Sequence, residues 1–262
     1  MAETDSYGRI HKPYYRNGAN HRAGADVSFA DIRRLMGFRT ISIGRWVSAD
    51  EQQLAANLFF DALCDLQDIL QVPYQVLSLN GHLSLSFGRG GRPGAAAHYE
   101  PAARNLALAK NAGGGALAHE WFHAFDHYIS ARFFSQARAA DFASSLWLQH
   151  DEFIAHPLNQ RLHHWFKQVF LNAEGTQPNA LVEAAIQADR ERQQQYYALP
   201  AELAARAFEA VVQDQPIRNA FLVKGTRQSP EAKAGLYPLG AHRQRLRQAA
   251  MSYFNGLGQL LS

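Results

Sequence analysis

The segment His119–His123, which reads His-Glu-Trp-Phe-His, constrains the fold more than any other feature of this chain. Residues four positions apart lie one above the other on an α-helix, so the segment predicts a helix that presents both imidazoles on one face. Trp121 and Phe125 predict that another side of this helix is buried deep in the fold. Two stacked histidines on such a helix are costly to bury without a partner. The alternative is that they line a solvated helix face.

The spacing of these residues suits a divalent metal ion. Two imidazoles stacked in this way can reach one zinc ion, and Glu120 projects about a quarter-turn to one side of them. Its carboxylate is then placed to take a proton from water. Asp126 follows His123 by three residues, so we expect it to accept an imidazole N–H. His127 lies on the same helix and cannot complete a tetrahedral site from another direction.

A tetrahedral zinc site needs a third protein ligand, and the best source is a helix expected at residues 201–212. Glu202, Arg206 and Glu209 form one stripe on this helix, so either glutamate is a candidate ligand. The alternative is an exposed polar face in which Arg206 pairs with both carboxylates. Tyr196 and Tyr197 precede the helix, and a tyrosine hydroxyl there could stabilise a developing oxyanion or simply pack.

Composition narrows the class of protein. The chain has 262 residues, of which 47% are hydrophobic and 19% charged, as in an ordinary globular protein. No apolar run is long enough to cross a membrane, and residues 1–20 lack the apolar stretch of a secretory signal. A single cysteine, Cys64, excludes an internal disulfide and suits the cytoplasm. The oligomeric state is not predictable from these features.

The charge balance argues against a dedicated nucleic-acid-binding protein. Lysine and arginine number 26 against 23 acidic residues, for a net charge of only +3. The basic clusters Arg9–Arg22 and Arg243–Arg247 are not interleaved with aromatic side chains, so they do not resemble a base-stacking platform. We interpret both clusters as solvated faces.

Periodicity and turn signals predict a single α+β domain over residues 25–262, preceded by an irregular arm at residues 1–24. Short apolar runs predict a small mixed sheet, with strands at Thr40–Val47 and at Leu106–Ala109. Gln75–Phe87 is expected to form either a strand pair around an Asn80-Gly81 turn or one bent strand. The first helix is expected at Phe29–Met36, with Ser28 as its N-cap, and the second runs from the capping box of Ser48 and Glu51 to Pro73. Further helices are expected between residues 141 and 195 with interruptions, at Ala201–Val212 and at Gly240–Leu261.

The segment Gly113–Tyr128 resembles the HEWxHxxD core of the large polyvalent protein-associated domains of phage and mobile elements. Those domains are predicted zincin-like metallopeptidases. A similar stand-alone bacterial family is the uncharacterised CLCA_X family. The resemblance covers most of residues 25–255 and includes the segments Met36–Val47, Leu79–Gly88, Tyr197–Glu209 and Tyr237–Arg243. It implies a zincin-like α+β fold with an active-site helix and a mostly helical C-terminal half.

A more distant resemblance links the chain to the catalytic domain of anthrax lethal factor, whose active helix also reads HExxHxxD. There a glutamate that opens a Glu-x-x-Ala-x-Ala-Phe helix is the third zinc ligand, and Glu202–Phe208 matches this pattern. The resemblance therefore favours Glu202 over Glu209 and makes Tyr197 the equivalent of a tyrosine that precedes the glutamate. Two residues depart from these families: Phe122 replaces a small glycine, and Arg206 replaces an acidic residue.

Together these observations predict a zinc-dependent metallopeptidase of the gluzincin type that acts on peptides or proteins. His119, His123 and Glu202 are the expected zinc ligands, and Glu120 is the expected general base and then acid. Asp126 is expected to orient an imidazole and Tyr197 to steady the oxyanion. The same ligands could bind iron as a facial triad, so zinc is an inference. The alternative is a catalytically silent zincin-fold interaction module associated with mobile DNA or other partners.

Overall fold

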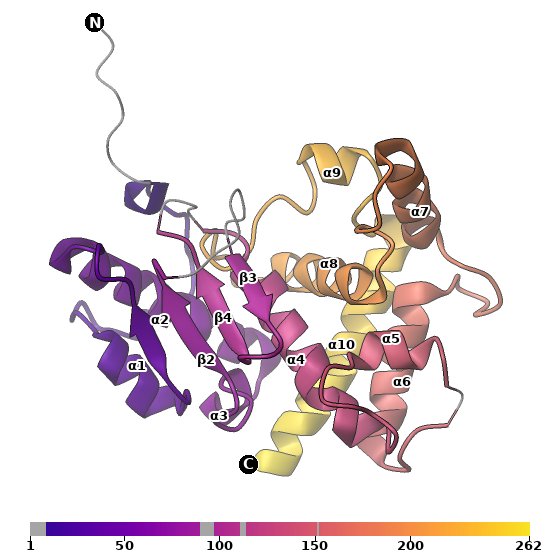
Figure 1. Ribbon diagram of the computed structural model, residues 1–262, viewed down its shortest axis with the longest axis horizontal. Coiled ribbons are helices and arrows are strands. Elements are labelled where there is room, and N and C mark those ends of the chain that lie inside the picture. Colours follow the sequence, from indigo (N-terminus) through magenta and orange to yellow (C-terminus); the bar gives the residue numbers. More distant parts are fainter. Residues whose placement is uncertain (1–8, 90–96, 111–113, 151) are drawn as a thin grey trace, which may run out of the picture. The chain divides into compact units, whose positions relative to one another are not determined.

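The computed structural model describes residues 9–89, 97–110, 114–150 and 152–262. The chain forms two compact units, which we describe separately (Figure 1). The sheet unit comprises Met1–Ile69, Pro73–Ala124 and Ile217–Lys224, and the helical unit comprises Leu70–Val72, Phe125–Pro216 and Gly225–Ser262. The predicted N-terminal arm lies partly outside the described residues, since residues 1–8 are not among them.

The sheet unit contains a small mixed sheet, as the sequence predicts. Its four strands lie in the order β1-β2-β4-β3, where β1, β2 and β4 are parallel and β3 is antiparallel to β4. All four residues of β2 are buried, because β2 lies inside the sheet. The strands are β1 (Ile41–Ile43), β2 (Ser84–Phe87), β3 (Ala97–Glu100) and β4 (Asn105–Leu108).

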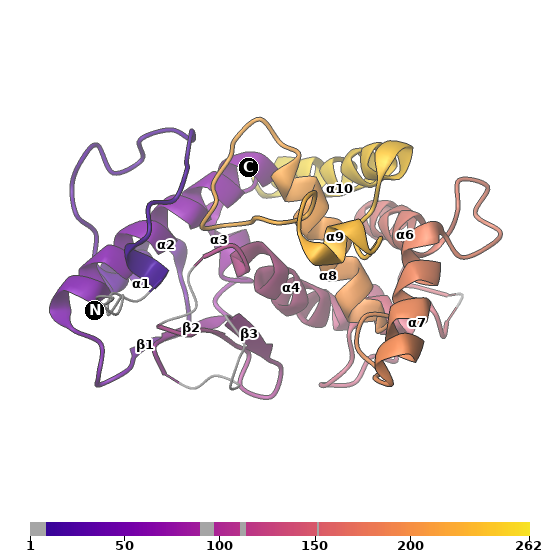
Figure 2. The same cartoon turned by 90° about the horizontal axis from the view of Figure 1, so that it is seen from above.

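Helices α1 (Phe29–Met36) and α2 (Ala49–Leu70) complete the core of the sheet unit. Figure 2 shows α2 running along one face of the sheet. The rings of Phe29, Phe59 and Phe87 meet there with centroids 5.8 to 6.3 Å apart. The predicted N-cap Ser28 is confirmed, and it forms a capping box with Asp31 at the start of α1. The predicted capping box at the start of α2 is also confirmed, since Ser48 and Glu51 exchange hydrogen bonds there.

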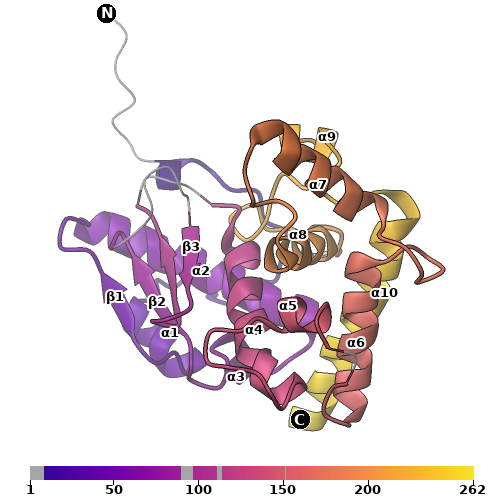
Figure 3. The same cartoon turned by 45° about the vertical axis from the view of Figure 1, so that its right-hand side comes forward.

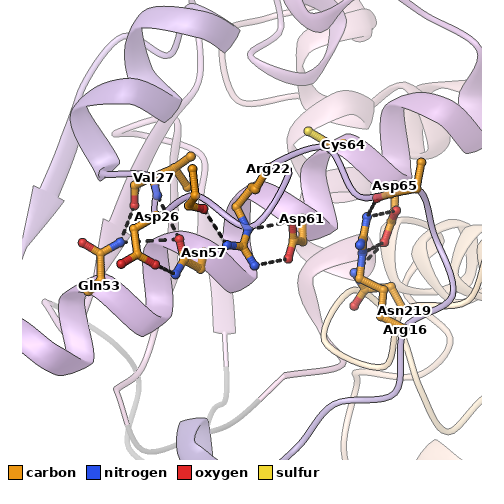
Figure 4. A network of polar contacts seen from close by, with 12 residues as sticks. Arg16, Arg22, Asp26, Val27, Gln53, Asn57, Asp61, Cys64, Asp65 and Asn219 are labelled. Atoms are coloured by element: carbon orange, nitrogen blue, oxygen red, sulfur yellow. Dashed lines mark hydrogen bonds and ion pairs between the residues drawn. The ribbon is translucent and has the colours of Figure 1, made fainter.

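A segment before α1 is anchored to α2 by ion pairs, which Figure 4 shows. The guanidinium of Arg16 donates two hydrogen bonds of 2.7 Å to the buried carboxylate of Asp65, and Asn219 donates a third. Arg22 binds Asp61 in the same bidentate manner. The interpretation of this basic cluster as a solvated face is therefore wrong for Arg16 and Arg22.

Two predictions for the strands need correction, and a further strand was not predicted. The first half of the expected strand pair within Gln75–Phe87 is the helical turn α3 (Tyr74–Leu77), and only its second half forms a strand. Leu79 and Asn80 adopt left-handed backbone conformations, with φ of 51° and 58°, which end the helical turn instead of closing a hairpin. β1 is shorter than Thr40–Val47, and β3 was not predicted.

Among the described residues, six helices lie wholly within the helical unit, and α6 and α10 pack side by side (Figure 3). A side chain at Gly258 would bring its Cβ within 2.1 Å of the Gln71 carbonyl oxygen, so glycine permits close packing against α10. The predicted helix at Gly240–Leu261 is confirmed. The six helices are α5 (Ala143–Trp147), α6 (Pro157–Phe170), α7 (Ala180–Arg192), α8 (Pro200–Gln213), α9 (Pro230–Lys233) and α10 (Gly240–Leu261).

Hydropathy along the helices bears on membrane insertion. Within the described part of the chain, none of the helices combines the length and the apolar character required to span a bilayer.

Candidate metal centre

The helix that carries the His119–His123 segment is α4 (Leu117–Phe133), and its start is held by main-chain contacts. The N–H of Gly115 donates to the Phe221 carbonyl at 2.7 Å, and the N–H of Ala118 donates to the Leu222 carbonyl at 3.0 Å. A Cβ at Gly114 would lie 2.5 Å from the Phe221 ring, so glycine is needed for this close approach. The preceding residue, Gly113, lies outside the described residues.

His119 and His123 face each other on α4, as their spacing predicts. Their Nε2 atoms are 3.0 Å apart, and their ring centroids are 4.6 Å apart with an interplanar angle of 80°. Each residue is only 9% exposed. The alternative of a solvated histidine face is therefore wrong, and two imidazole nitrogens converge in a buried environment.

Glu120 lies between the histidines in sequence and reaches the sheet. Its Oε2 accepts a hydrogen bond of 2.6 Å from the main-chain N–H of Tyr99 on β3. The carboxylate is therefore fixed through one oxygen to the outermost strand of the sheet. The sequence carried no signal for this contact, because β3 itself was not predicted.

The two aromatic residues within the segment are core residues. Trp121 is fully buried and donates its indole N–H to the Leu77 carbonyl at 3.0 Å. Phe122, which replaces the glycine of the resembling families, is also buried. These contacts satisfy the only polar atom of Trp121 and fix the rotation of α4 about its axis.

Asp126 and His127 lie one turn further along α4. The fully buried carboxylate of Asp126 accepts hydrogen bonds from the main-chain N–H of Ser144 at 2.8 Å and from its hydroxyl at 2.5 Å. Its expected role in orienting an imidazole stays a prediction. Nε2 of His127 lies 2.7 Å from the Ala139 carbonyl oxygen, a contact that explains its burial without a metal.

The predicted stripe on α8 is real but is not an exposed face. Glu202, Arg206 and Glu209 are all buried, so the alternative of a solvated polar face is wrong. Arg206 lies over the rings of Tyr197 and Tyr237, 4.7 and 5.3 Å from their centroids. The hydroxyl of Tyr237 donates a hydrogen bond of 3.0 Å to Oε2 of Glu209. Glu209 therefore has a structural partner that the sequence did not indicate.

The segment before α8 is organised by Asp189, another residue that sequence reasoning missed. Its carboxylate accepts main-chain hydrogen bonds from residues 196, 197 and 198. Burial alone would raise the pKa of Asp189, but these N–H donors outweigh it and the pKa is lowered. Asp189 thereby fixes the turn that carries the two tyrosines.

The two tyrosines on this turn have different surroundings. Burial, together with the nearby Glu202 carboxylate, raises the pKa of Tyr196. The ring of Tyr197 instead lies against two guanidinium groups, those of Arg192 and Arg206, each 4.7 Å from its centroid. The role expected for Tyr197 stays a prediction, and Tyr196 is the tyrosine whose environment includes Glu202.

The chemistry of the ligand set fits a zinc ion. His119 and His123 on α4 supply two imidazole nitrogens, and Glu202 on α8 is the predicted carboxylate ligand. Two nitrogen ligands on one tetrahedral zinc lie roughly 3.3 Å apart, which is close to the spacing of the two Nε2 atoms. Two imidazoles and one carboxylate leave a fourth position for water, as in hydrolytic zinc sites.

The lone cysteine offers no competing chemistry. Cys64 is fully buried in α2, and burial raises the pKa of its thiol to about 11. A thiol with so high a pKa is a poor nucleophile at neutral pH.

The sequence model of a family described as large polyvalent protein-associated domain 1 matches residues 188–261. Over that segment, the resemblance to these domains is confirmed. The matched segment contains α8 and α10, with Glu202 and Glu209, whereas His119–His123 lies before it. No curated protein and no solved structure shows significant similarity to the chain.

Proposed function

We propose that this protein is a zinc-dependent peptidase of the gluzincin type, with a zincin-like fold. The observation that carries the proposal is the pair of buried imidazoles on α4, whose Nε2 atoms converge at 3.0 Å beside Glu120. The resemblance of Gly113–Tyr128 to zincin-like domains and of the Glu202 helix to lethal factor supports the same chemistry.

His119, His123 and Glu202 would hold the metal. When bound, zinc supplies a Lewis acid that polarises a peptide carbonyl and acidifies a water molecule. The choice of zinc over iron rests on the hydrolytic role that a carboxylate base beside the ligands suggests.

Glu120 performs the proton transfers in this proposal. Its Oε1 takes a proton from the attacking water, and the same oxygen then delivers that proton to the leaving nitrogen as the peptide C–N bond breaks. The products are a carboxylic acid and an amine, so the water is fully accounted for. Tyr197 or its neighbour Tyr196 would donate a hydrogen bond to the carbonyl oxygen as negative charge develops there.

Metal analysis of purified variants tests the ligand set. About one zinc ion per chain is expected in the wild-type protein, with loss in His123→Ala and in Glu202→Ala. His127→Ala is the matched control, because this histidine lies on the same helix and contacts the Ala139 carbonyl. Glu209→Gln should keep its zinc. Loss of zinc from Glu209→Gln with retention in Glu202→Ala would reassign the third ligand.

Turnover separates an enzyme from a silent module. The wild-type protein is incubated with a library of peptides from a digested proteome, and new termini are identified by mass spectrometry. Glu120→Gln should retain zinc and lose cleavage by at least about a hundredfold. Equal cleavage in both proteins would exclude Glu120 as the base. Zinc binding without any cleavage would favour the catalytically silent interaction module.

A further inference from the structure

The position of Tyr99 on β3 determines where its main-chain N–H points. β3 is the outermost strand of the order β1-β2-β4-β3, and Tyr99 pairs with Leu106 on β4. In an antiparallel pair, the main-chain N–H and C=O groups of successive residues point alternately toward the partner strand and away from it. The carbonyl of Leu108 accepts a hydrogen bond from the N–H of Gly88, which follows β2, so the main-chain groups of Leu108 point toward β2. Leu106 lies two residues earlier, so its main-chain groups also point toward β2.

It follows that Ala97 and Tyr99, the partners of Leu108 and Leu106, direct their N–H groups away from β4. An outward N–H on an edge strand ordinarily binds water or another chain. Here the N–H of Tyr99 donates instead to Oε2 of Glu120, at 2.6 Å. The open edge of the sheet and the carboxylate on α4 are thus joined by one hydrogen bond.

This bond restricts a side chain that would otherwise be mobile. A glutamate has several rotatable bonds, and ordering such a side chain costs conformational entropy. A hydrogen bond to an ionised carboxylate is short and about twice as strong as one between neutral groups. The contact therefore holds the carboxylate in one orientation and occupies Oε2, which leaves Oε1 for proton transfer.

We infer that the main-chain N–H of Tyr99 is the positioning group for Glu120, and that strand β3 thereby aligns the base of the site. The inference rests on the proposed function, since it specifies how the base of that reaction is oriented. The positioning group belongs to the backbone, so the tyrosine side chain is not required for it.

The hydrogen bond can be tested without turnover or metal. The chain has ten tyrosines, so protein labelled with ¹⁵N-tyrosine gives ten amide signals, and Tyr99→Phe identifies the signal of residue 99 by its disappearance. In Glu120→Ala, that signal should move upfield and its hydrogen exchange should accelerate by about tenfold or more. Glu120→Gln, which keeps an acceptor oxygen, should give an intermediate change.

Glu100→Ala is the matched control, because it removes an exposed carboxylate next to Tyr99 on the same strand. The Tyr99 signal should be nearly unchanged in this variant. The other nine tyrosine signals report whether each variant keeps its fold. An identical Tyr99 amide in the wild-type protein and in folded Glu120→Ala and Glu120→Gln would overturn the inference.

A proline scan extends the test to catalysis. Tyr99→Pro removes the outward N–H without removing a ladder hydrogen bond, and Ala97→Pro removes the equivalent N–H two residues away. Tyr99→Pro should lower kcat by about tenfold with little change in KM or zinc content, whereas Ala97→Pro should not. Equal kcat values in the two variants would overturn the positioning role.

The two proposals fail in different ways. Absence of turnover in the wild-type protein, with a Tyr99 amide that responds to Glu120→Ala, would remove the peptidase and leave the positioning contact. Turnover that depends on Glu120, with an unresponsive Tyr99 amide, would remove the positioning contact and leave the peptidase.

Discussion

Two buried arginines of the helical unit, Arg243 on α10 and Arg206 on α8, have the same exposed fraction of 7% but opposite environments. Arg243 donates two hydrogen bonds of 2.7 Å to the carboxylate of Asp214 and further bonds to Thr226. Its charge is paired and its donors are satisfied, as is usual for a buried arginine. The interpretation of Arg243 as part of a solvated basic face is therefore wrong.

Arg206 is buried with fewer of its donors satisfied. Within the part of the chain that the structure describes, neither its Nε nor its Nη1 has a hydrogen-bond partner. Burial would lower the pKa of Arg206, but Tyr237 and Glu209 outweigh this effect and the pKa is raised. Three tyrosine rings, those of Tyr196, Tyr197 and Tyr237, surround the guanidinium at 4.7 to 5.9 Å.

The comparison teaches that burial alone does not show what a charged residue contributes. A paired arginine such as Arg243 stabilises the fold, because its removal leaves a buried carboxylate without its cation. An arginine with two unsatisfied nitrogens adds little net stability, because its desolvation opposes its cation–π contacts. Arg206 also lies between Glu202 and Glu209 on α8, so its positive charge lies close to both candidate metal ligands.

The largest expected effect comes from breaking the paired arginine. Arg243→Met should lower the free energy of unfolding by about 3 to 5 kcal/mol, because it leaves Asp214 without its principal partner. Urea denaturation measures the loss. Arg227→Met is the control, since Arg227 also binds Asp214 but has a side chain that is 59% exposed, and its loss should cost at most about 1 kcal/mol. Equal losses of stability in the two variants would show that the exposure of an arginine does not determine its contribution.

Low pH should weaken the ion pair of Arg243 and Asp214, and the direction of this effect follows from the pKa of Asp214. Burial would raise the pKa of Asp214, but hydrogen bonds from Arg243 and Arg227 lower it below its usual value of 3.8. The paired carboxylate therefore stabilises the fold above that value, and the contribution is lost as the pH falls through the lowered folded-state pKa.

Urea denaturation across this acidic range measures the effect. The difference in stability between the wild-type protein and Arg243→Met should shrink as the pH falls below 3.8. A constant difference would mean that the Asp214 carboxylate does not couple to Arg243.

The smallest effect on stability is expected from the substitution of Arg206. Arg206→Met should change the free energy of unfolding by no more than about 1 kcal/mol, because removing the buried charge offsets the lost contacts with the rings. A loss of stability as large as that in Arg243→Met would show that the tyrosine rings stabilise a buried guanidinium as well as hydrogen bonds do. The two variants are best compared in one denaturation series.

Much of the candidate site was predictable because it depends on local geometry. Residues four apart on a helix must stack, so His119 and His123 face each other wherever the helix packs. The caps at Ser28 and Ser48 and the helix at Gly240–Leu261 follow from side chains that bond their own backbone or repeat at helical spacing. The match of residues 188–261 to a family model agrees with the resemblance to the large polyvalent protein-associated domains drawn from Tyr197–Glu209 and Tyr237–Arg243.

Other features depend on residues that are distant in sequence. The contact between Tyr99 and Glu120 requires β3, a strand of four residues with no strong pattern. Tyr74–Leu77 has strand-forming residues but forms a helical turn, and Leu79 and Asn80 after it adopt left-handed conformations. Propensity in such short segments is weaker than tertiary contacts.

The sequence by itself determined which residues stack on one helix face and which side chains cap the helices, since these interactions span four residues or fewer. Only the tertiary structure decided that Arg243 meets Asp214 while Arg206 meets tyrosine rings. Both arginines lie on helices, and the sequence does not encode locally which distant group reaches each one. The physical reason is that pairing of buried charges is set by packing between elements, whereas helix geometry is set within one element.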